Sequence, residues 1–343
     1  MIRPERILVF ELNWLGDILF SFPFLRAIRK AFPEAYIACV VVPRYADLLV
    51  NNPWVNDVHA LSDSNRITSL GEKVAFIRMI RKEKYDTCFL LKPSRVKTIM
   101  AELAGIPERI GFKGKTANLT QEVEMPGGKL HRADVLLSLA GAVGVTRADG
   151  NYEYFLTEED REHASILVRE AGGGTRRTVA VNPGGNWEAK RWPPDRFAEL
   201  AGKILGRFSD VEVMVTGGEK DIGLAEYIVS KVGSDRCFAV AGRTGLNTLA
   251  AVFEKCFLVI SADSGPLHLA SATGAATIGL FGPTTHKMTG PRGKGRNIII
   301  SKYVDCEIPC YVEKCDKDYF CMRSIEVEEV FSAAEKVLAD ESR

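Results

Sequence analysis

The sequence contains no long hydrophobic run, no excess charge of either sign and no low-complexity tract. Its longest apolar stretches, such as residues 37–42, have the length of a strand, whereas a membrane-spanning helix needs about 20 apolar residues. The 45 lysines and arginines balance 44 aspartates and glutamates, which gives a formal net charge of +1. This balance argues against the basic surface that nucleic-acid-binding proteins present, so no nucleic-acid partner is expected.

The N-terminal apolar stretch is too short for a secretory signal peptide, because it stops at Glu11. We therefore predict a cytoplasmic protein in which any membrane contact is peripheral. Hydrophobic residues make up 46% of the 343-residue chain and charged residues 26%, as is typical of a folded globular protein. At about 150 residues per domain, the length predicts two domains.

Strand-sized apolar segments alternate with segments of helical periodicity along the whole chain. Between residues 18 and 28, for example, apolar side chains recur every three or four positions, as on one face of a helix. In the first half, strands are expected near 7–12, 36–42, 86–91 and 109–112. A second series of strands and helices runs from 178 to 280. Such alternation predicts the α/β class, with parallel sheets covered by helices on both faces.

A glycine-rich segment at residues 171–177 separates the two series. We predict two Rossmann-like domains facing a cleft, one over residues 1–165 and the other over residues 175–322, followed by a final helix within residues 323–343. In open α/β sheets, ligands bind beyond the carboxyl ends of the strands. The loops that follow strands are therefore the places to look for functional residues.

The first such loop, Asn-Trp-Leu-Gly-Asp over residues 13–17, ends at the expected start of a helix. Gly16 permits a tight turn or a close approach of the backbone to a ligand. The dipole of the helix stabilises a carboxylate at this position, which suits Asp17 to act as a general base. The alternative is that Asp17 only caps the helix.

Two later loops combine glycines with charged residues. The loop over residues 182–193 contains two glycines with Asn186, Lys190 and Arg191, and such backbone N–H groups and cations suit an anionic ligand. In the loop over residues 216–221, Gly217 leaves room for a ligand, and Glu219 can accept hydrogen bonds from ribose hydroxyls. A solvated surface loop and an ordinary strand–helix turn are the alternatives for these two segments.

The segment Asp263-Ser264-Gly265 follows another strand and leads into a helix. The N–H groups of Ser264 and Gly265, at the positive end of this helix, can cradle a diphosphate. His268 belongs to the first turn of the same helix, and its alternative role is purely structural. Together these loops predict a site for a phosphate-bearing ligand on the C-terminal half, with a carboxylate offered from the N-terminal half.

Three motifs resemble, in the same order, those of the ADP-heptose:lipopolysaccharide heptosyltransferases, glycosyltransferase family 9. The first is residues 13–17 with the segment Pro-x-Leu-Arg-Ala-Ile at 23–28, and its Asn-Trp-x-Gly-Asp form is closer to the heptosyltransferase II type. The second runs from Pro-Gly at 183–184 to Lys-Arg-Trp-Pro at 190–193. The third combines Asp-Ser-Gly-Pro-Leu-His-Leu-Ala at 263–270 with Phe-Gly-Pro-Thr at 281–284.

The resemblance implies a GT-B fold with the acceptor on the N-terminal domain, the nucleotide-sugar donor on the C-terminal domain, and a last helix that returns toward the N-terminal domain. It implies inverting transfer of a heptose or related sugar, from ADP-heptose, to an inner-core acceptor of lipopolysaccharide. Asp17 corresponds to the catalytic base, and Lys190 to the lysine that neutralises the donor diphosphate. Because such an acceptor is lipid-linked, we expect peripheral contact with the inner face of the membrane.

The resemblance and the loops together give one predicted donor site. Its phosphate-binding turn corresponds to residues 264, 265 and 268, its ribose contact to residue 219, and its base pocket to residues 244 and 246. The predicted donor-binding residues are Gly16, Asn186, Lys190, Gly217, Glu219, Thr244, Leu246, Asp263, Ser264, Gly265 and His268.

Four of the eight cysteines lie within sixteen residues near the C-terminus, namely Cys306, Cys310, Cys315 and Cys321. Their spacing differs from the paired C-x₂-C pattern of common zinc modules. Zinc, an iron–sulfur cluster, disulfides formed on handling and free thiols all stay open for them. The transfer reaction that the resemblance implies requires no cofactor.

Two other enzyme classes share parts of this pattern. A nicotinamide-dependent Rossmann oxidoreductase needs G-x-G-x-x-G after the first strand, where this chain has a single glycine. A GT-B nucleotide-sugar epimerase or hydrolase shares the fold and the donor pocket, but acts without an acceptor.

Overall fold

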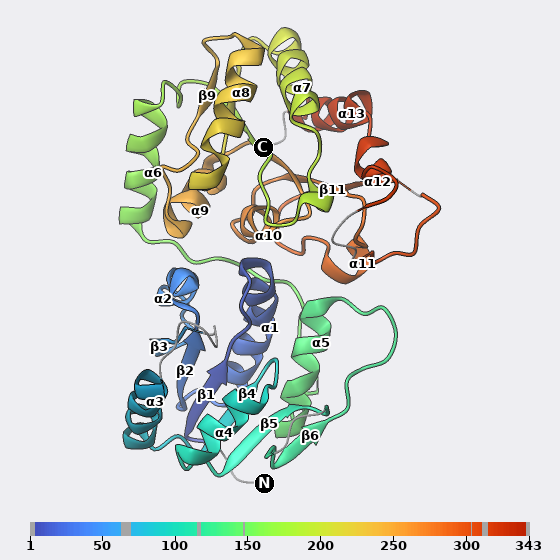
Figure 1. Ribbon diagram of the computed structural model, residues 1–343. Helices are drawn as coiled ribbons and strands as arrows, with labels where there is room; N and C mark the ends of the chain where they lie inside the picture. The colour runs from blue at the N-terminus through green and yellow to red at the C-terminus, as the bar shows by residue number, and fades with distance from the viewer. Residues whose placement is uncertain are drawn as a thin grey trace. The chain divides into compact units, whose positions relative to one another are not determined.

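The computed structural model describes residues 4–62, 70–114, 118–146, 148–302, 304–310 and 315–340 (Figure 1). The chain divides into two compact units, Met1–Tyr152 and Glu153–Arg343. The division falls earlier than the predicted glycine-rich linker, because helix α6 (Glu158–Glu170) contacts α9 (Leu246–Lys255) of the second unit. Within these described ranges, no helix is long and apolar enough to cross a membrane.

The first unit is built on a six-stranded parallel sheet in the order β3-β2-β1-β4-β5-β6. Its central strands are buried on both faces, which is why they read as continuous apolar runs in the sequence. Its elements are β1 (Arg6–Phe10), α1 (Leu15–Ala31), β2 (Tyr36–Val41), η1 (Pro43–Tyr45), α2 (Asp47–Val50), β3 (Asp57–Ala60), α3 (Leu70–Glu83), β4 (Thr87–Leu90), α4 (Arg95–Leu103), β5 (Glu108–Phe112), β6 (Gln121–Val123), α5 (Arg132–Ser138) and η2 (Leu139–Val143).

The second unit repeats this architecture with the strand order β12-β11-β10-β7-β8-β9. After α6 its elements are β7 (Arg177–Asn182), η3 (Glu188–Lys190), α7 (Pro194–Arg207), β8 (Val211–Val215), η4 (Glu219–Asp221), α8 (Ile222–Val232), β9 (Cys237–Ala239), α9, β10 (Leu258–Ala262), α10 (Gly265–Ala272), β11 (Thr277–Phe281), α11 (His286–Thr289), β12 (Asn297–Ser301), α12 (Phe320–Arg323) and α13 (Val327–Leu338). The prediction of an α/β protein with two Rossmann-like domains is confirmed.

Each sheet has one point at which the order of its strands reverses. In the first unit it lies between β1 and β4, and in the second between β7 and β10. The connections on the two sides of such a switch point lead away from each other, which leaves a crevice beyond the carboxyl ends of the two strands. The residues that directly follow these four strands are therefore placed to meet a ligand.

The final helix α13 packs within the second unit. Its buried side chains Val330, Ala334 and Val337 belong to that unit's core, and it contacts α7 and strands β10 to β12. The indole N–H of Trp192 donates to the carbonyl oxygen of Ile325, just before the helix, over 2.9 Å. The apolar stripe of α13 is therefore covered by α7 and the sheet of the second unit.

Candidate active site

An ion pair lies at the switch point of the second unit. Lys190 belongs to the loop after β7, Asp263 directly follows β10, and their Nζ and Oδ2 atoms are 2.7 Å apart. The two residues are 73 positions apart in sequence and meet because β7 and β10 are neighbouring strands. The Asp263 side chain is 3% exposed and that of Lys190 is 24% exposed, so solvent reaches the ammonium group but not the carboxylate.

Asp263 also receives other donors. Nε2 of His268 lies 3.4 Å from Oδ1, and the Thr284 hydroxyl donates to Oδ2 over 2.6 Å. Burial alone raises the pKa of Asp263, but the His268 hydrogen bond and the charge of Lys190 outweigh burial and hold that pKa well below its usual range. Asp263 is thus a fixed negative charge that orients Lys190 and His268.

Helix α10 begins directly beside this pair. Its N-cap is Ser264, whose side chain makes no capping bond but lies 3.0 Å from the hydroxyl of Ser261. Pro266 occupies the first turn, where a missing N–H costs nothing. The first-turn N–H groups of a helix have no partner within it, so this N-terminus, with Gly265, suits an anion. The structure therefore brings predicted residues Lys190, Ser264, Gly265 and His268 together around Asp263.

Two glycines, Gly184 after β7 and Gly217 after β8, lie close to the side chain of Asp221. A Cβ atom on Gly184 would lie 2.4 Å from Oδ2 of Asp221, and one on Gly217 would lie 2.7 Å from the Asp221 Cβ. The buried Asp221 carboxylate accepts the N–H of Gly218 over 3.0 Å. Gly217 therefore leaves room for Asp221, while Glu219, on η4, is exposed at the carboxyl end of the same sheet.

The other predicted donor residues lie in the loops after β7 and β9 and at the start of α9. Asn186 accepts a hydrogen bond from the Lys220 ammonium group. Thr244, in the loop after β9, and Leu246, the first residue of α9, are half-buried and follow the edge strand of the sheet. They are therefore at the carboxyl end of the same sheet as Lys190, two strands along from it.

In the first unit, Asp17 lies in the first turn of α1, with Gly16 before it. The N-cap of this helix is Trp14, so the alternative that Asp17 is merely the cap is wrong. Asp17 lines a pocket of about 410 Å³. Three basic side chains also line this pocket: Lys92 after β4, Lys113 after β5, and Arg132 at the start of α5. Asp17 is thus a half-buried carboxylate in a positively charged pocket.

None of these three basic residues is among the site residues that the sequence predicts. Lys113 comes directly after β5, and Arg132 begins α5. The rule that residues after strands meet ligands would have found Lys113, because the strand over residues 109–112 was predicted. Arg132 carries no comparable signal, because its place at the pocket depends on how α5 packs against α1.

The four clustered cysteines line one apolar cavity of about 140 Å³, together with Gly282, Pro283 and Phe320. Across the ranges given above, the structure contains no group of three or more His, Cys, Asp or Glu side chains placed to hold a metal ion. Burial raises the pKa of the Cys321 thiol, which disfavours the thiolate that a metal requires. The predicted zinc or iron–sulfur site at Cys306, Cys310, Cys315 and Cys321 is therefore not supported.

Two doubly wound domains, with a helix N-terminus at a switch point, form an architecture that nucleotide-binding enzymes use. Residues 73–319 match the family described as glycosyltransferase family 9 (heptosyltransferase), and the chain belongs to this family. It is therefore a glycosyltransferase, and neither the oxidoreductase nor the epimerase alternative is needed.

Known relatives agree with this assignment. The chain is 25% identical to lipopolysaccharide heptosyltransferase 2 of Salmonella typhimurium over 315 residues, which cover 86% of this chain and 87% of that protein. A family 9 glycosyltransferase from Veillonella parvula superposes with a TM-score of 0.86 at 25% identity, covering 98% of both chains. ADP-heptose heptosyltransferase II of Escherichia coli superposes with a TM-score of 0.82 at 22% identity, covering 98% of this chain and all of that one.

Proposed function

We propose that this glycosyltransferase transfers a heptose from ADP-heptose to an inner-core acceptor of lipopolysaccharide, with inversion at the anomeric carbon. The relatives named as heptosyltransferases support the sugar and the acceptor. The single observation that carries the proposal is the Lys190–Asp263 pair beside the N-terminus of α10. We assign the donor to the second unit and the acceptor to the first.

The donor diphosphate is bound by the Lys190 ammonium and the first-turn N–H groups at Ser264 and Gly265. Asp263 fixes the direction of Lys190 before the donor arrives, so little reorganisation is needed when negative charge develops on the leaving nucleotide. Donors that are already oriented toward that charge favour the transition state over the ground state. Glu219, Thr244 and Leu246 are assigned to the adenosine of the donor.

Asp17 removes the proton from the attacking hydroxyl of the acceptor. A sugar hydroxyl is a weak nucleophile, and a positioned general base contributes roughly 10²–10⁴-fold to the rate. Lys92, Lys113 and Arg132 line the Asp17 pocket and attract acidic or phosphorylated saccharides. The transfer uses these side chains and backbone amides without a cofactor. Because its acceptor is lipid-linked, we assign the enzyme to the cytoplasm, at the inner membrane surface.

The variant Asp17→Asn tests the base. We expect transfer to fall by about 10²–10⁴-fold while ADP binding is unchanged, measured by ADP release with acceptor and by calorimetry. Asp47→Asn is the matched control, since Asp47 is an exposed acid in the first turn of α2 in the same unit. Native-rate transfer by Asp17→Asn would remove Asp17 from the mechanism. Tighter binding of UDP or GDP than of ADP would overturn the assignment of ADP-heptose as the donor. An NMR assignment of the anomeric configuration of the product tests whether the transfer inverts it.

A further inference from the structure

Helices α3 and α4 of the first unit carry many exposed apolar side chains. Of the thirteen large apolar side chains that are exposed in the described ranges, five lie on these two helices. The four in the second unit are spread over α6, α8 and α12. Single exposed apolar residues are normal on a protein surface, whereas several on neighbouring elements mark an interaction site.

On α4 these side chains follow one face of the helix. Val96, Ile99 and Leu103 are 40%, 46% and 51% exposed, and spacings of three and four residues place them in a single stripe. Met100 and Ala101, which α4 buries in the core of the unit, lie off this stripe. The stripe therefore adds nothing to the core that the described residues form.

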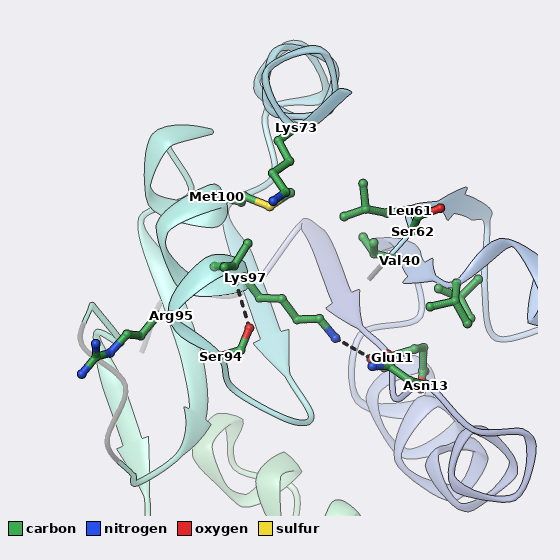
Figure 2. Close-up of a pocket in the computed structure, with 13 residues that line it drawn as sticks. Glu11, Asn13, Val40, Leu61, Ser62, Lys73, Ser94, Arg95, Lys97 and Met100 are labelled. Atoms are coloured by element: carbon green, nitrogen blue, oxygen red, sulfur yellow. Dashed lines mark hydrogen bonds between the residues drawn. The ribbon is translucent and has the colours of Figure 1, made fainter. Parts of the chain in front are cut away.

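Helix α3 extends this apolar surface. Leu70 and Val74, one turn apart, are 79% and 37% exposed. The two helices contact each other, and the Arg81 guanidinium on α3 donates to the carbonyl oxygen of Leu103, the last residue of α4. Near their other ends both helices line one pocket, into which Lys73 extends from α3 (Figure 2). Together the exposed side chains form one surface, the α3–α4 patch, which consists of Leu70, Val74, Val96, Ile99 and Leu103.

Basic side chains surround the α3–α4 patch. The two helices carry six lysines and arginines against three glutamates, in a chain whose total charge is only +1. Arg78 and Lys82 are exposed on α3, and Figure 2 shows the exposed side chain of Arg95, on α4, directed away from the pocket. Of the acids, Glu83 is paired with Arg6 over 2.8 Å. The patch is therefore apolar with a positively charged rim.

The α3–α4 patch begins beside the pocket of Asp17. The loop after β4 gives Leu91, Lys92 and Pro93 to that pocket, and Val96 of the patch follows three residues later. A lipid-linked acceptor that reaches Asp17 while its lipid stays in a bilayer requires the bilayer to lie close to this part of the first unit. The patch is thus close enough in the chain to contact that bilayer.

We propose that the α3–α4 patch is the surface through which this enzyme binds an anionic lipid bilayer. Its apolar side chains enter the boundary between head groups and acyl chains, and the surrounding cations bind lipid phosphates. This inference rests on the proposed function, which supplies the lipid-linked acceptor, and names the surface that brings this acceptor to Asp17. A second copy of the chain fits the patch less well, because a symmetric contact would bring its basic rim against itself.

Flotation of the full chain with lipid vesicles tests the bilayer contact. We expect binding to vesicles that contain phosphatidylglycerol and at least tenfold weaker binding to vesicles of phosphatidylcholine, because each cation near an anionic surface contributes about fivefold. Binding should weaken between ionic strengths of about 0.1 M and 1 M, where the Debye length falls from about 10 Å to about 3 Å. Equal binding to the two kinds of vesicle, or binding to neither, would overturn the proposal.

The variant Ile99→Gln tests the apolar part of the contact. We expect at least fivefold weaker binding to anionic vesicles, because a side chain that enters the bilayer becomes polar. Ile166→Gln is the matched control, since Ile166 is a helical isoleucine of the second unit with a similar exposure of 39%. Circular dichroism and ADP binding establish that both variants are folded. Equal vesicle binding by the two variants would remove the patch from the contact.

The double variant Arg78→Gln/Lys82→Gln tests the basic rim. Its binding to anionic vesicles should fall about 25-fold at low ionic strength and change little at about 1 M. Arg169→Gln/Lys336→Gln alters the net charge equally, at two exposed helical positions of the second unit, and should bind like the wild type. Equal losses in the two double variants would mean that only net charge matters, which contradicts a defined surface.

Transfer assays separate this inference from the proposed function. With an inner-core oligosaccharide released from its lipid, Ile99→Gln should transfer at the wild-type rate, whereas transfer to lipid-linked acceptor in anionic vesicles should slow at least fivefold. No transfer by the wild type to the released oligosaccharide would contradict the proposed function, while vesicle binding would still decide the role of the patch. A wild-type dimer in sedimentation velocity that Ile99→Gln abolishes would assign the patch to a second copy and overturn the proposal.

Discussion

The two units use one sheet topology and place a buried carboxylic acid at the same kind of position, with opposite results. Asp263 follows β10 and Glu11 follows β1, so each stands at the switch point of its own sheet. Asp263 is surrounded by an ammonium, an imidazole and a hydroxyl, whereas one oxygen of Glu11 has no described partner. The pKa of Asp263 is held low, and that of Glu11 is raised to about 8.

This comparison shows that burial alone does not decide the charge of an acid. Both side chains lose nearly all contact with water, and that loss raises the pKa of each. The number of donors aimed at the carboxyl then decides the outcome. Asp263 is an anion that holds Lys190 in place, whereas burial favours the neutral form of Glu11.

The largest expected effect concerns the pH dependence of stability at Glu11. The carboxyl of the unfolded chain loses its proton near the ordinary glutamate pKa of 4.5, and the folded carboxyl only near 8. The unfolded state thus binds fewer protons between these values, and the free energy of unfolding falls as pH rises, by on the order of 5 kcal/mol. Urea unfolding of Glu11→Gln should lack this component. A stability difference from the wild type that stays constant across this range would break the comparison.

The next effect is expected at Asp263. Asp263→Asn leaves Lys190 beside a neutral amide, and breaking a buried ion pair costs roughly 3 kcal/mol of unfolding free energy near pH 7. Because the folded pKa is lowered, the contribution of Asp263 is present above the ordinary aspartate pKa of 3.8 and lost as pH falls through the folded value. The penalty in Asp263→Asn should therefore shrink in acid, as urea titrations can show. A penalty that grows in acid would contradict the assigned charge.

The smallest expected effect concerns the stability contributed by two threonine hydroxyls near the Asp263 carboxylate. The Thr284 hydroxyl donates to Oδ2 over 2.6 Å, whereas that of Thr289 lies 3.5 Å away. Hydrogen bonds to charged groups contribute about 1.5–3 kcal/mol, so Thr284→Val should destabilise by about 2 kcal/mol and Thr289→Val by less than about 1. Thermal unfolding of the two variants, which change shape equally, measures the difference. Equal losses of stability in the two variants would mean that the hydrogen bond from Thr284 to Asp263 stabilises the fold no more than the longer Thr289 contact does.

The sequence was sufficient for the sheets and for most loops of the site. Parallel strands covered on both faces must be apolar throughout, so 178–182 and 257–260 could be recognised as strands without a structure. The residues after them, Lys190 and Ser264 among them, follow from the rule that ligands meet the carboxyl ends of strands. What could not be predicted was the partner of each side chain. Gly217, for instance, accommodates the Asp221 side chain, a contact that no local pattern in the sequence predicts.

By itself, then, the sequence determined the α/β class, the family and the segments that carry functional residues, because these depend on local patterns of polarity and on the order of motifs. Only the tertiary structure decided that Lys190 is held by Asp263 and that Glu11, which the sequence showed merely as the end of an apolar strand, is a buried acid with an unpaired oxygen among the described residues. The charge and hydrogen bonding of a buried group depend on neighbours distant in sequence, and the packing of the sheet selects them.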